Sequence, residues 1–448
     1  MPDLHLRGIL LWAVCSFLAL YSLTAAGARQ TVFPLHISAN QRYLEDAAGQ
    51  PFLMVADTAW SLIGDLSREE IDSYLADRKK RGFNTILVSL IEHHFSRNAP
   101  RNFYQQSPFK ENGNFAAPNE AYFDNVEWFL RRASDDRFLV LLVPAYLGVN
   151  GGNEGWYREM QIAGAGALKT YGDYIGKRFA KFSNIIWIQG GDYDPPDRDL
   201  VESLATAIAI ANPGTIQSVH GGRDARTDFV WPEAHWKQLD TVYTYGNVAA
   251  ATLQQYLARP TRPFFLIEGV YEGENGATEE TVRTSAYSAL LTGAAGQVFG
   301  NNPVWHFSGP GLHGETVPWP MALSSRGAQS MTYLKDFFNT IPWWNLEPDQ
   351  GKTLTSENTS TSGIAVAGRS RDGKLIAVYL SGMRSLTLRA DVSKQSTTNA
   401  KWFDPSSGKY IPAKKPMVTT AGNLEYTVPN IRNASGYGDW LLVLTQGD

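Results

Sequence analysis

The sequence contains a single cysteine, Cys15, among 448 residues. One cysteine cannot form an intrachain disulfide, and this one lies inside an N-terminal segment that has the features of a cleaved leader. If the leader is removed, the mature protein has no thiolate nucleophile and no cysteine ligand for zinc. Export without disulfides fits a bacterial periplasm or the cell exterior.

Blocks of positive charge and several common enzyme motifs are also missing. The 40 Lys and Arg residues stand against 44 Asp and Glu residues, which gives a net charge of −4. Because no basic run is present to track phosphates, nucleic acid is not an expected partner. The absence of a Walker loop, a G-x-S-x-G elbow and an H-E-x-x-H helix removes the usual signatures of P-loop proteins, serine hydrolases and zincins. We expect no cofactor.

Residues 1–28 predict a signal peptide. His5 and Arg7 precede an apolar run from Ile9 to Leu23, and Ala26-Gly-Ala28 supplies a small-residue cleavage site. The run is shorter than the roughly 20 residues that a membrane-spanning helix needs, and an uncleaved anchor is the alternative. We expect an exported protein, periplasmic or secreted, with no stable membrane association after cleavage. The sequence leaves the oligomeric state open.

Eight apolar runs alternate with helical patterns in the first three quarters of the chain. They are Phe52–Asp57, Phe83–Ile91, Phe138–Tyr146, Ile185–Gln189, Thr215–His220, Leu239–Tyr245, Phe264–Glu268 and Gly296–Asn301. Consecutive apolar residues are typical of parallel strands that are buried on both faces. The pattern therefore predicts an α/β fold, a (β/α)8 TIM barrel over residues 29–348. The alternative, an open doubly wound sheet, would place a Gly-rich turn after the first strand, where Asp57-Thr-Ala-Trp60 stands.

The last hundred residues have a different pattern. Short alternating runs such as Lys374–Leu380 and Asp439–Thr445 are separated by turn pairs such as Asp372-Gly373 and Ser407-Gly408. Alternation with turns of this kind is typical of antiparallel strands. We expect a smaller C-terminal antiparallel β-sandwich over residues 349–448.

Polar and aromatic residues follow the ends of the eight runs. The active site of a (β/α)8 barrel lies at these carboxyl ends, and an inert barrel would not require such residues there. The 13 Trp residues fit either a carbohydrate cleft, where rings pack on sugar C–H faces, or a large core. The candidates for substrate binding are Asp57, Trp60, His93, His94, Tyr146, Gln189, His220, Tyr245, Asn302 and Trp305.

Two of the strand ends deliver a carboxylate. Glu268 ends the seventh run, and Asp192 follows the fourth. A glutamate after a strand is more often an ordinary solvated residue, but two acids across a barrel mouth fit a retaining glycosidase, whose carboxyl groups lie about 5–5.5 Å apart. Asp192 would then be the general acid, with a raised pKa, and Glu268 the ionised nucleophile. His220 and Tyr245 would orient the nucleophile or contact sugar hydroxyls.

Other acids have separate interpretations. Asp57, on the first strand, is expected to bind a sugar hydroxyl rather than to donate a proton. Asp194, which precedes two prolines, is the main rival to Asp192 as the acid. Glu272 and Glu274, in the loop after the seventh strand, are expected to be solvated.

Glu92-His93-His94 is the only cluster that suggests a metal ligand set. Adjacent residues on a strand point to opposite faces, so the two imidazoles cannot share one ion while the strand continues. We expect no metal site.

Several motifs resemble the apiosidase-like glycoside hydrolases, family 140. They are Pro51-Phe-Leu-Met-Val-Ala-Asp57-Thr-Ala-Trp60-Ser-Leu62, Gly82-Phe-Asn-Thr85, Trp187-Ile-Gln-Gly-Gly-Asp192 and Phe265-Leu-Ile-Glu268. The tail from Trp402 to Gly408 resembles the β-sandwich that follows this barrel, often labelled collagen-binding, so that the resemblance runs from about Leu35 to Asp448. Many relatives in the wider clan carry Asn-Glu after the fourth strand, where this chain has Gly191-Asp192.

The resemblance implies an acid/base at Asp192, a nucleophile at Glu268 and the removal of terminal apiose from plant cell-wall side chains such as those of rhamnogalacturonan II. We therefore expect an exported retaining exo-glycosidase that acts on an oligo- or polysaccharide, including pectic side chains. The alternative from another class is a non-catalytic carbohydrate- or matrix-binding protein, in which the sandwich binds and the barrel is a scaffold.

Overall fold

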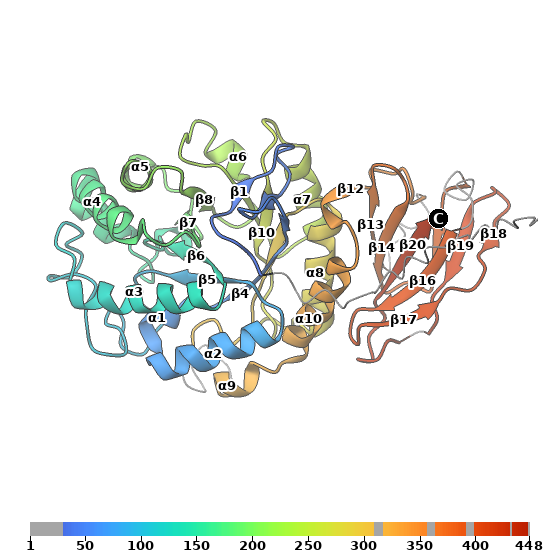
Figure 1. Ribbon diagram of the computed structural model, residues 1–448, viewed down its shortest axis with the longest axis horizontal. Helices are drawn as coiled ribbons and strands as arrows, with labels where there is room; N and C mark the ends of the chain where they lie inside the picture. The colour runs from blue at the N-terminus through green and yellow to red at the C-terminus, as the bar shows by residue number, and fades with distance from the viewer. Residues whose placement is uncertain (1–29, 309–316, 356–362, 391–397, 431, 447–448) are drawn as a thin grey trace, which may run out of the picture. The chain divides into compact units, whose positions relative to one another are not determined.

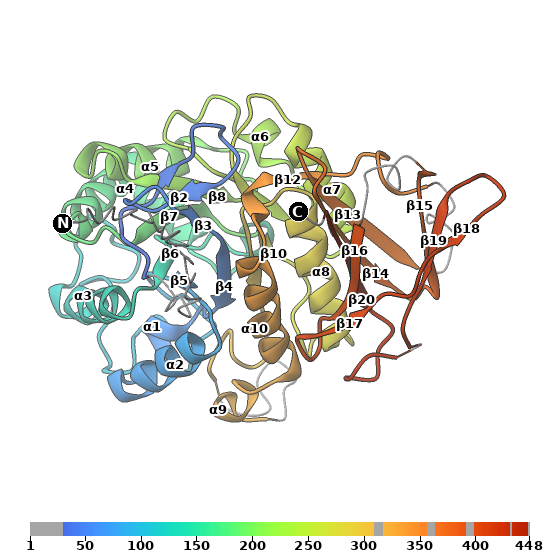
Figure 2. The ribbon, with the colours of Figure 1, turned by 45° about the vertical axis from the view of Figure 1, so that its right-hand side comes forward.

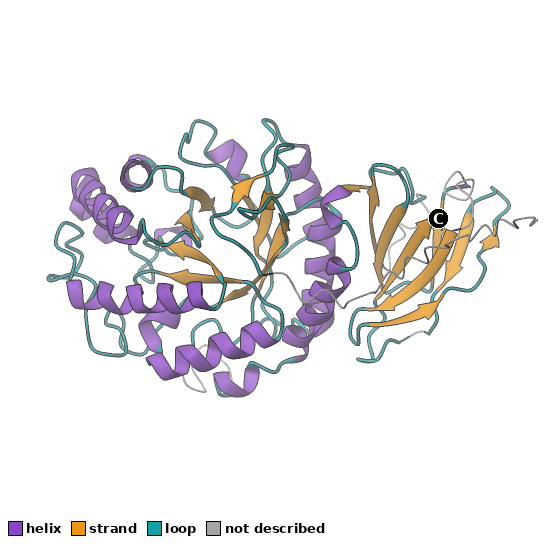
Figure 3. Cartoon of the chain, viewed as in Figure 1, coloured by secondary structure: helices purple, strands orange, loops and turns teal. Residues whose placement is uncertain are grey.

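The computed structural model describes residues 30–308, 317–355, 363–390, 398–430 and 432–446. The predicted leader, with Cys15, lies outside the described residues. None of the helices in the described ranges combines the length and the apolar character needed to cross a bilayer. Figure 3 shows a region in which strands and helices alternate, followed by a region of strands.

The first region is a nearly closed barrel of eight parallel strands (Figure 1). Ladders join its strands in the order β8-β7-β6-β5-β4-β11-β10-β9. The gap between β8 and β9 is bridged by the backbone N–H groups of Gln238 and Leu239, which both donate to the carbonyl oxygen of Gln217. The predicted (β/α)8 TIM barrel is confirmed. Its strands are β4 (Met54–Thr58), β5 (Thr85–Ser89), β6 (Leu139–Val143), β7 (Ile185–Gly190), β8 (Ile216–His220), β9 (Asp240–Tyr243), β10 (Phe264–Glu268) and β11 (Gly296–Phe299).

Helices surround the barrel (Figure 2). Two of them begin at a capping box. In a capping box the N-cap hydroxyl accepts a hydrogen bond from the backbone N–H three residues later, and the side chain of that later residue accepts one from the backbone N–H of the N-cap residue. The two pairs are Ser67 with Glu70, and Thr278 with Thr281. The helices are α1 (Leu62–Asp65), α2 (Arg68–Lys80), α3 (Glu120–Asp135), α4 (Tyr157–Phe179), α5 (Asp199–Ala211), α6 (Thr227–Val230), α7 (Val248–Leu257), α8 (Glu279–Leu291), α9 (Trp319–Ala322) and α10 (Arg326–Asn339), with 3-10 turns η1 (Val149–Gly151) and η3 (Trp343–Asn345).

Side chains fill the interior of the barrel. Met54, Leu141 and Ile186 belong to one buried cluster that also includes Leu35 and Leu44 from the N-terminal segment. That segment forms a small antiparallel sheet of β1 (His36–Ile37), β2 (Leu44–Glu45) and β3 (Pro51–Phe52). A larger cluster packs the outer faces of the strands against the helices. The barrel is therefore a packed core, and the room for a site lies at its carboxyl rim.

The second region is the predicted antiparallel β-sandwich. A six-stranded and a three-stranded sheet share one apolar cluster, to which Val378 and Leu442 contribute from the first sheet and Leu386 and Tyr426 from the second. Its first strand, β12, covers Leu346–Pro348, which lie at the end of the barrel segment predicted from the sequence, 29–348. The strands are β12 (Leu346–Pro348), β13 (Ile364–Ser370), β14 (Leu375–Ser381), β20 (Trp440–Gln446), β16 (Thr398–Asp404) and β17 (Lys409–Pro412) in one sheet, and β15 (Ser385–Leu388), β19 (Leu424–Thr427) and β18 (Met417–Val418) in the other.

A buried ion pair joins helix α8 to the sandwich. The Arg283 guanidinium donates from Nε and Nη2 to the two carboxylate oxygens of Asp439, at 2.6 and 2.7 Å, and both side chains are fully buried. Asp439 also accepts from the Tyr379 hydroxyl and from the Asn433 amide. Beside the pair, the rings of Tyr287 and Tyr379 stack with centroids 5.0 Å apart. The attraction within a bidentate ion pair, together with further hydrogen bonds to the carboxylate, can offset the free-energy cost of removing the two charges from water.

We predict that Asp439→Asn lowers the free energy of unfolding by about 3–5 kcal/mol, because it leaves the Arg283 cation buried without its carboxylate. Urea denaturation of the purified protein measures this. The matched control is Glu347→Gln, which removes the carboxylate of the partly exposed Arg371 pair and is expected to change stability by less than about 1 kcal/mol. Equal stability of the Asp439 variant and the native protein would contradict the role given to the pair.

Candidate active site

The turn after β7 brings Asp192 to the rim of the barrel. Gly190, Gly191 and Asp192 all have positive φ, at 85°, 127° and 54°. Glycine accepts this conformation readily, and aspartate is among the few other residues that do. A Cβ atom at Gly191 would lie 2.3 Å from the ring of Tyr146, so only glycine allows the ring to approach this closely. The two glycines therefore aim Asp192 and leave room for its tyrosine partner.

The carboxylate of Asp192 is held by one oxygen. Its Oδ2 accepts a hydrogen bond of 2.6 Å from the Tyr146 hydroxyl, whereas Oδ1 is buried and has no hydrogen-bond partner among the described residues. Burial, together with the charge of Asp192, raises the pKa of Tyr146 and keeps its hydroxyl protonated as the donor. Asp192 is thus fixed in orientation while one oxygen is left for a bound molecule.

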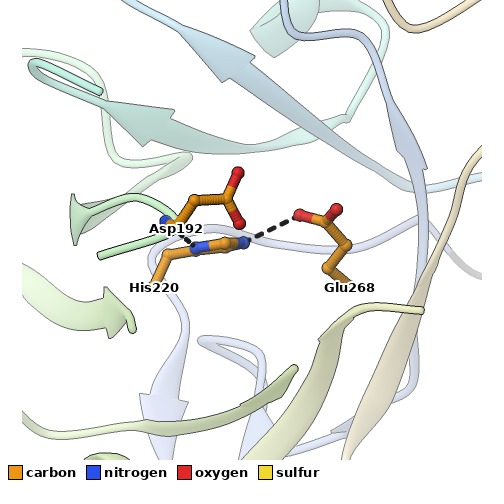
Figure 4. Close-up of side chains that lie close together, drawn as sticks. All are labelled: Asp192, His220 and Glu268. Carbon is orange, nitrogen blue, oxygen red and sulfur yellow. Dashed lines mark hydrogen bonds and ion pairs between the residues drawn. The ribbon is translucent and has the colours of Figure 1, made fainter. Parts of the chain in front are cut away.

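Glu268, the last residue of β10, is held by both oxygens. Oε2 lies 2.9 Å from Nε2 of His220, and Oε1 accepts from the Tyr245 hydroxyl at 3.0 Å. His220 is fully buried at the end of β8, and Tyr245 follows β9. Figure 4 shows the imidazole of His220 bonded to the backbone nitrogen of Asp192 on one side and to the carboxylate of Glu268 on the other. Adjacent strands therefore supply both groups that orient the glutamate.

His220 connects the two acids through its two ring nitrogens. The backbone N–H of Asp192 donates to Nδ1 at 3.0 Å, so Nδ1 carries a lone pair, and the proton of the neutral ring lies on Nε2, where it is donated to Glu268. Burial lowers the pKa of His220, and the carboxylates of Glu268 and Asp192 raise it by more. The hydrogen bond from Asp192 holds the proton at Nε2, where it binds the glutamate.

The same three residues are also the candidate ligand set for a metal ion. Asp192, His220 and Glu268 each offer one donor atom, and these atoms lie within 4.8 Å of one another. A metal at Nε2 of His220 would have to replace the proton that is donated to Glu268, while Nδ1 is occupied by a backbone N–H. The hydrogen bonds of the ring fit a proton at this position better than an ion.

The sequence predicted that Glu268 stays ionised, whereas in the structure the pKa of this carboxyl is raised. Burial and the nearby charge of Asp192 raise the pKa of Glu268 to about 7, against the hydrogen bonds from His220 and Tyr245, which lower it. The cause is desolvation, because the side chain lies in the floor of the site and not at its mouth. The carboxylate form of Glu268 is thus well populated only from neutral pH upward.

A pocket with a volume of about 130 Å³ lies over the two acids. Its walls are mainly aromatic, and hydrogen bonds fix two of the rings: Trp60 Nε1 donates to the Tyr271 hydroxyl at 2.9 Å, and Trp305 Nε1 donates to Glu274 at 2.7 Å. Rings of this kind can cover the C–H face of a sugar. The lining residues are Trp60, Ser89, Phe95, Tyr146, Val149, Asp192, Tyr245, Glu268, Tyr271, Glu274 and Trp305.

Four of the predicted binding residues line this pocket, namely Trp60, Tyr146, Tyr245 and Trp305. His220 lies beneath it and has no exposed surface. It therefore holds Glu268 and does not contact a sugar.

Asp57 and Gln189 are buried elsewhere. Asp57 points to helix α2, where it accepts from the Tyr74 hydroxyl at 2.6 Å and pairs with Arg78 at 3.4 Å. Burial raises the pKa of Asp57 to about 6, while Arg78 and Tyr74 lower it. Gln189 donates to the side chain of Gln217 inside the fold. The expected sugar contacts of both residues are not supported, because a position near a strand end does not say which face the side chain takes.

The remaining candidates lie outside the pocket lining. His93 contacts Glu159 at 3.3 Å and packs edge-on against Trp156, and His94 is exposed. Asn302 is bonded to His306. The loop that carries the histidines is fixed by Glu92, whose Oε1 accepts from three successive backbone N–H groups. In this loop Glu92 is a structural anchor.

The rival acid, Asp194, does not reach the pocket. Its Oδ2 accepts from the backbone N–H of Gly222 at 3.1 Å, so it holds the loop after β8. Glu272 is not solvated as expected, because it accepts from the backbone N–H of Gly327 and from Asn301. Glu274 is not simply solvated either, because it is half-buried in the pocket wall.

The sequence reasoning did not single out Tyr271, Phe95, Ser89 or Val149, and it assigned Glu274 to solvent. The first two stand in loops just beyond strand ends, and aromatic residues in those positions were an available signal. Neither the residue type nor the position in the sequence of Ser89 and Val149 indicates that they line the pocket.

Comparison with known proteins places the chain among carbohydrate-active enzymes. Residues 38–345 match the family described as "Apiosidase-like, catalytic domain", and residues 347–445 match "Putative collagen-binding domain of a collagenase". A search of curated proteins found no match.

Two solved structures share the fold. One described as "Glycoside hydrolase" has 24% identity and a TM-score of 0.77, over 93% of this chain and 99% of its own. A glycoside hydrolase family 5 protein from Bacteroides vulgatus ATCC 8482 has 22% identity and a TM-score of 0.76, over 92% of each chain. The catalytic-domain match covers more than half of the chain, so the non-catalytic alternative is set aside. The chain is a glycoside hydrolase and belongs to the apiosidase-like family.

Proposed function

We propose that the protein is an exported retaining exo-glycosidase that removes a terminal sugar from plant cell-wall or pectic side chains. In this proposal Asp192 is the general acid/base and Glu268 is the nucleophile. The barrel of residues 29–348 carries the reaction, and residues 349–448 form a second domain. The resemblance to apiosidases favours apiose as the sugar.

One observation carries the proposal: the two carboxylates face each other across the floor of one pocket, with an oxygen of each within 4.8 Å. Inverting enzymes keep their carboxyl groups about 6.5–9.5 Å apart to admit a water molecule, whereas retaining enzymes keep them about 5–5.5 Å apart. The spacing therefore supports direct attack by one carboxylate on the sugar.

In the first step an oxygen of Glu268 forms a bond to the anomeric carbon while the bond to the leaving oxygen breaks. Asp192 gives its proton to that oxygen from Oδ1, the atom that has no partner in the described structure. The Tyr146 hydroxyl stays on Oδ2 and stabilises the carboxylate that forms. His220 and Tyr245 prevent Glu268 from rotating away from the ring.

In the second step Asp192 removes a proton from water, and the water oxygen attacks the anomeric carbon. The ester bond to Glu268 breaks, which returns its carboxylate to the hydrogen bonds from His220 and Tyr245. Two displacements at one carbon restore its original configuration.

Replacement of either acid should abolish turnover without loss of the fold. We predict that Glu268→Gln and Asp192→Asn each lower kcat at least about a hundredfold, because one removes the nucleophile and the other the proton donor. Hydrolysis of apiose-, arabinofuranose- and pectin-derived oligosaccharides, with circular dichroism as the fold check, measures this. The matched control is Asp194→Asn, two residues from Asp192 and outside the pocket. Full activity in either acid variant would remove that residue from the mechanism.

The stereochemistry of the product tests the double displacement directly. Proton NMR during the first turnovers should show the sugar released with the anomeric configuration of the substrate, before mutarotation. An inverted first product would exclude attack by Glu268 and would require a water molecule between the acids.

The pH profile tests which acid is the nucleophile. Glu268 reacts only when ionised, and its pKa is raised to about 7, so kcat/KM should rise with pH across that range. Tyr245→Phe removes a hydrogen bond that stabilises the ionised form and should move this acidic limb to higher pH. Because the acids interact, the apparent value belongs to the pair. A limb that moves to lower pH in the Tyr245 variant would contradict the assignment.

A further inference from the structure

A third carboxylate lines the pocket beside the two proposed catalytic acids. Glu274 follows β10 by six residues and is half-buried in the pocket wall. The mechanism above has no use for it, because the acid/base and the nucleophile are already supplied. Its Oε2 accepts no hydrogen bond from the described residues and is not buried, so this oxygen is open to a donor from a bound molecule.

The loop that presents Glu274 is built rigidly. Gly273, Asn275 and Gly276 have positive φ, at 88°, 50° and 75°. Backbone hydrogen bonds run from Glu274 to the carbonyl of Tyr271 and from Ala277 to the carbonyl of Glu274. These bonds hold the backbone on both sides of Glu274 in one conformation.

The two ends of the loop are fixed to the barrel as well. Tyr271 accepts from Trp60, and Glu272 accepts from the backbone of Gly327 and from Asn301. The carboxylate of Glu274 is therefore positioned before any ligand binds, and little conformational entropy is lost on binding.

Among the described residues, only one oxygen of Glu274 has a hydrogen-bond partner. Oε1 accepts from the indole Nε1 of Trp305 at 2.7 Å, and the described residues offer no donor to Oε2. The indole of Trp305 in turn packs edge-on against Phe95, with ring centroids 5.1 Å apart. Glu274 and Trp305 together thus place a free acceptor oxygen, Oε2, next to an apolar indole ring on one wall of the pocket.

We propose that Glu274 binds a hydroxyl group of the sugar ring through Oε2, with Trp305 covering the adjacent C–H face, and that this pair selects a neutral sugar that carries a hydroxyl at that position. The inference rests on the proposed glycosidase function. A sugar hydroxyl is a donor, and its hydrogen bond to a carboxylate is about twice as strong as a neutral one. A site built to bond a hydroxyl discriminates strongly against an analogue that lacks it.

The charge of the pocket supports a neutral ligand. Its lining includes Asp192, Glu268 and Glu274, and no Lys or Arg stands among the lining residues in the described part of the chain. Arg223, which lies over the Tyr245 ring, is exposed and is not in the lining. A uronic acid would bring a further carboxyl group next to these acids, and no cation stands in the described lining to pair it. Like charges in one cleft disfavour binding.

The experiment compares Glu274→Ala and Glu274→Gln with the native protein on para-nitrophenyl apiofuranoside, on an analogue that lacks one ring hydroxyl, and on para-nitrophenyl glucuronide. Glu274→Ala should lower kcat/KM on the full sugar by about tenfold to a hundredfold, mostly through KM. The Gln variant should lose less, because its amide oxygen still accepts from Trp305. The loss should shrink on the deoxy analogue, where the bonded hydroxyl is already absent, and the native protein should not act on the glucuronide.

Calorimetric titration of the same apiofuranoside into Glu268→Gln, with and without the second substitution Glu274→Ala, measures how much Glu274 contributes to binding affinity in the absence of turnover. This separates the two proposals: retained hydrolysis in Glu268→Gln would refute the mechanism, and the comparison of KM between Glu274→Ala and the native protein would still test the binding. The matched control is Asp173→Asn, which removes the carboxylate of an exposed ion pair on α4, outside the pocket, and should leave KM within about twofold. Unchanged KM and affinity in Glu274→Ala, or an equal loss on the deoxy analogue, would overturn the assignment.

Discussion

The site depends on the link that His220 makes between two strand ends. The backbone N–H of Asp192 donates to Nδ1 of the ring, so Nδ1 must carry a lone pair. The proton of the neutral ring then lies on Nε2, which donates it to Glu268. The positive-φ turn after β7 is needed to point that N–H at the ring. One local conformation thus sets the position of Asp192, the tautomer of His220 and the orientation of Glu268 together.

This arrangement opposes stability in one respect. Glu268 has its pKa raised to about 7 from an ordinary carboxyl value, so the folded protein holds a proton that the unfolded chain releases at lower pH. Its contribution to stability is therefore present at acid pH and is lost as the pH rises through the folded pKa. The fold must offset this cost elsewhere, and the buried cores inside and outside the barrel supply the apolar burial that can do so.

Helix α8 connects the sandwich to the loop that lines the site. Helix α8 begins directly after the loop that carries Glu274, and Arg283 on that helix is bound to Asp439 of the sandwich by two short hydrogen bonds. Glu272, at the start of the loop, is bound to the N-terminal turn of α10. The loop is thus fixed at both ends by elements that pack against other parts of the fold.

The sequence by itself determined the barrel, the sandwich and the two acids, because parallel strands buried on both faces leave a strong local pattern and their carboxyl ends must meet at one rim. It also brought Trp60, Tyr146 and Tyr245 to the list of candidates. Tertiary structure alone decided that Asp57 turns to Arg78, that His220 lies below the pocket, and that Glu274 enters it. The reason is physical: a strand pattern fixes where a residue stands along the chain, whereas the face that its side chain takes depends on partners distant in sequence.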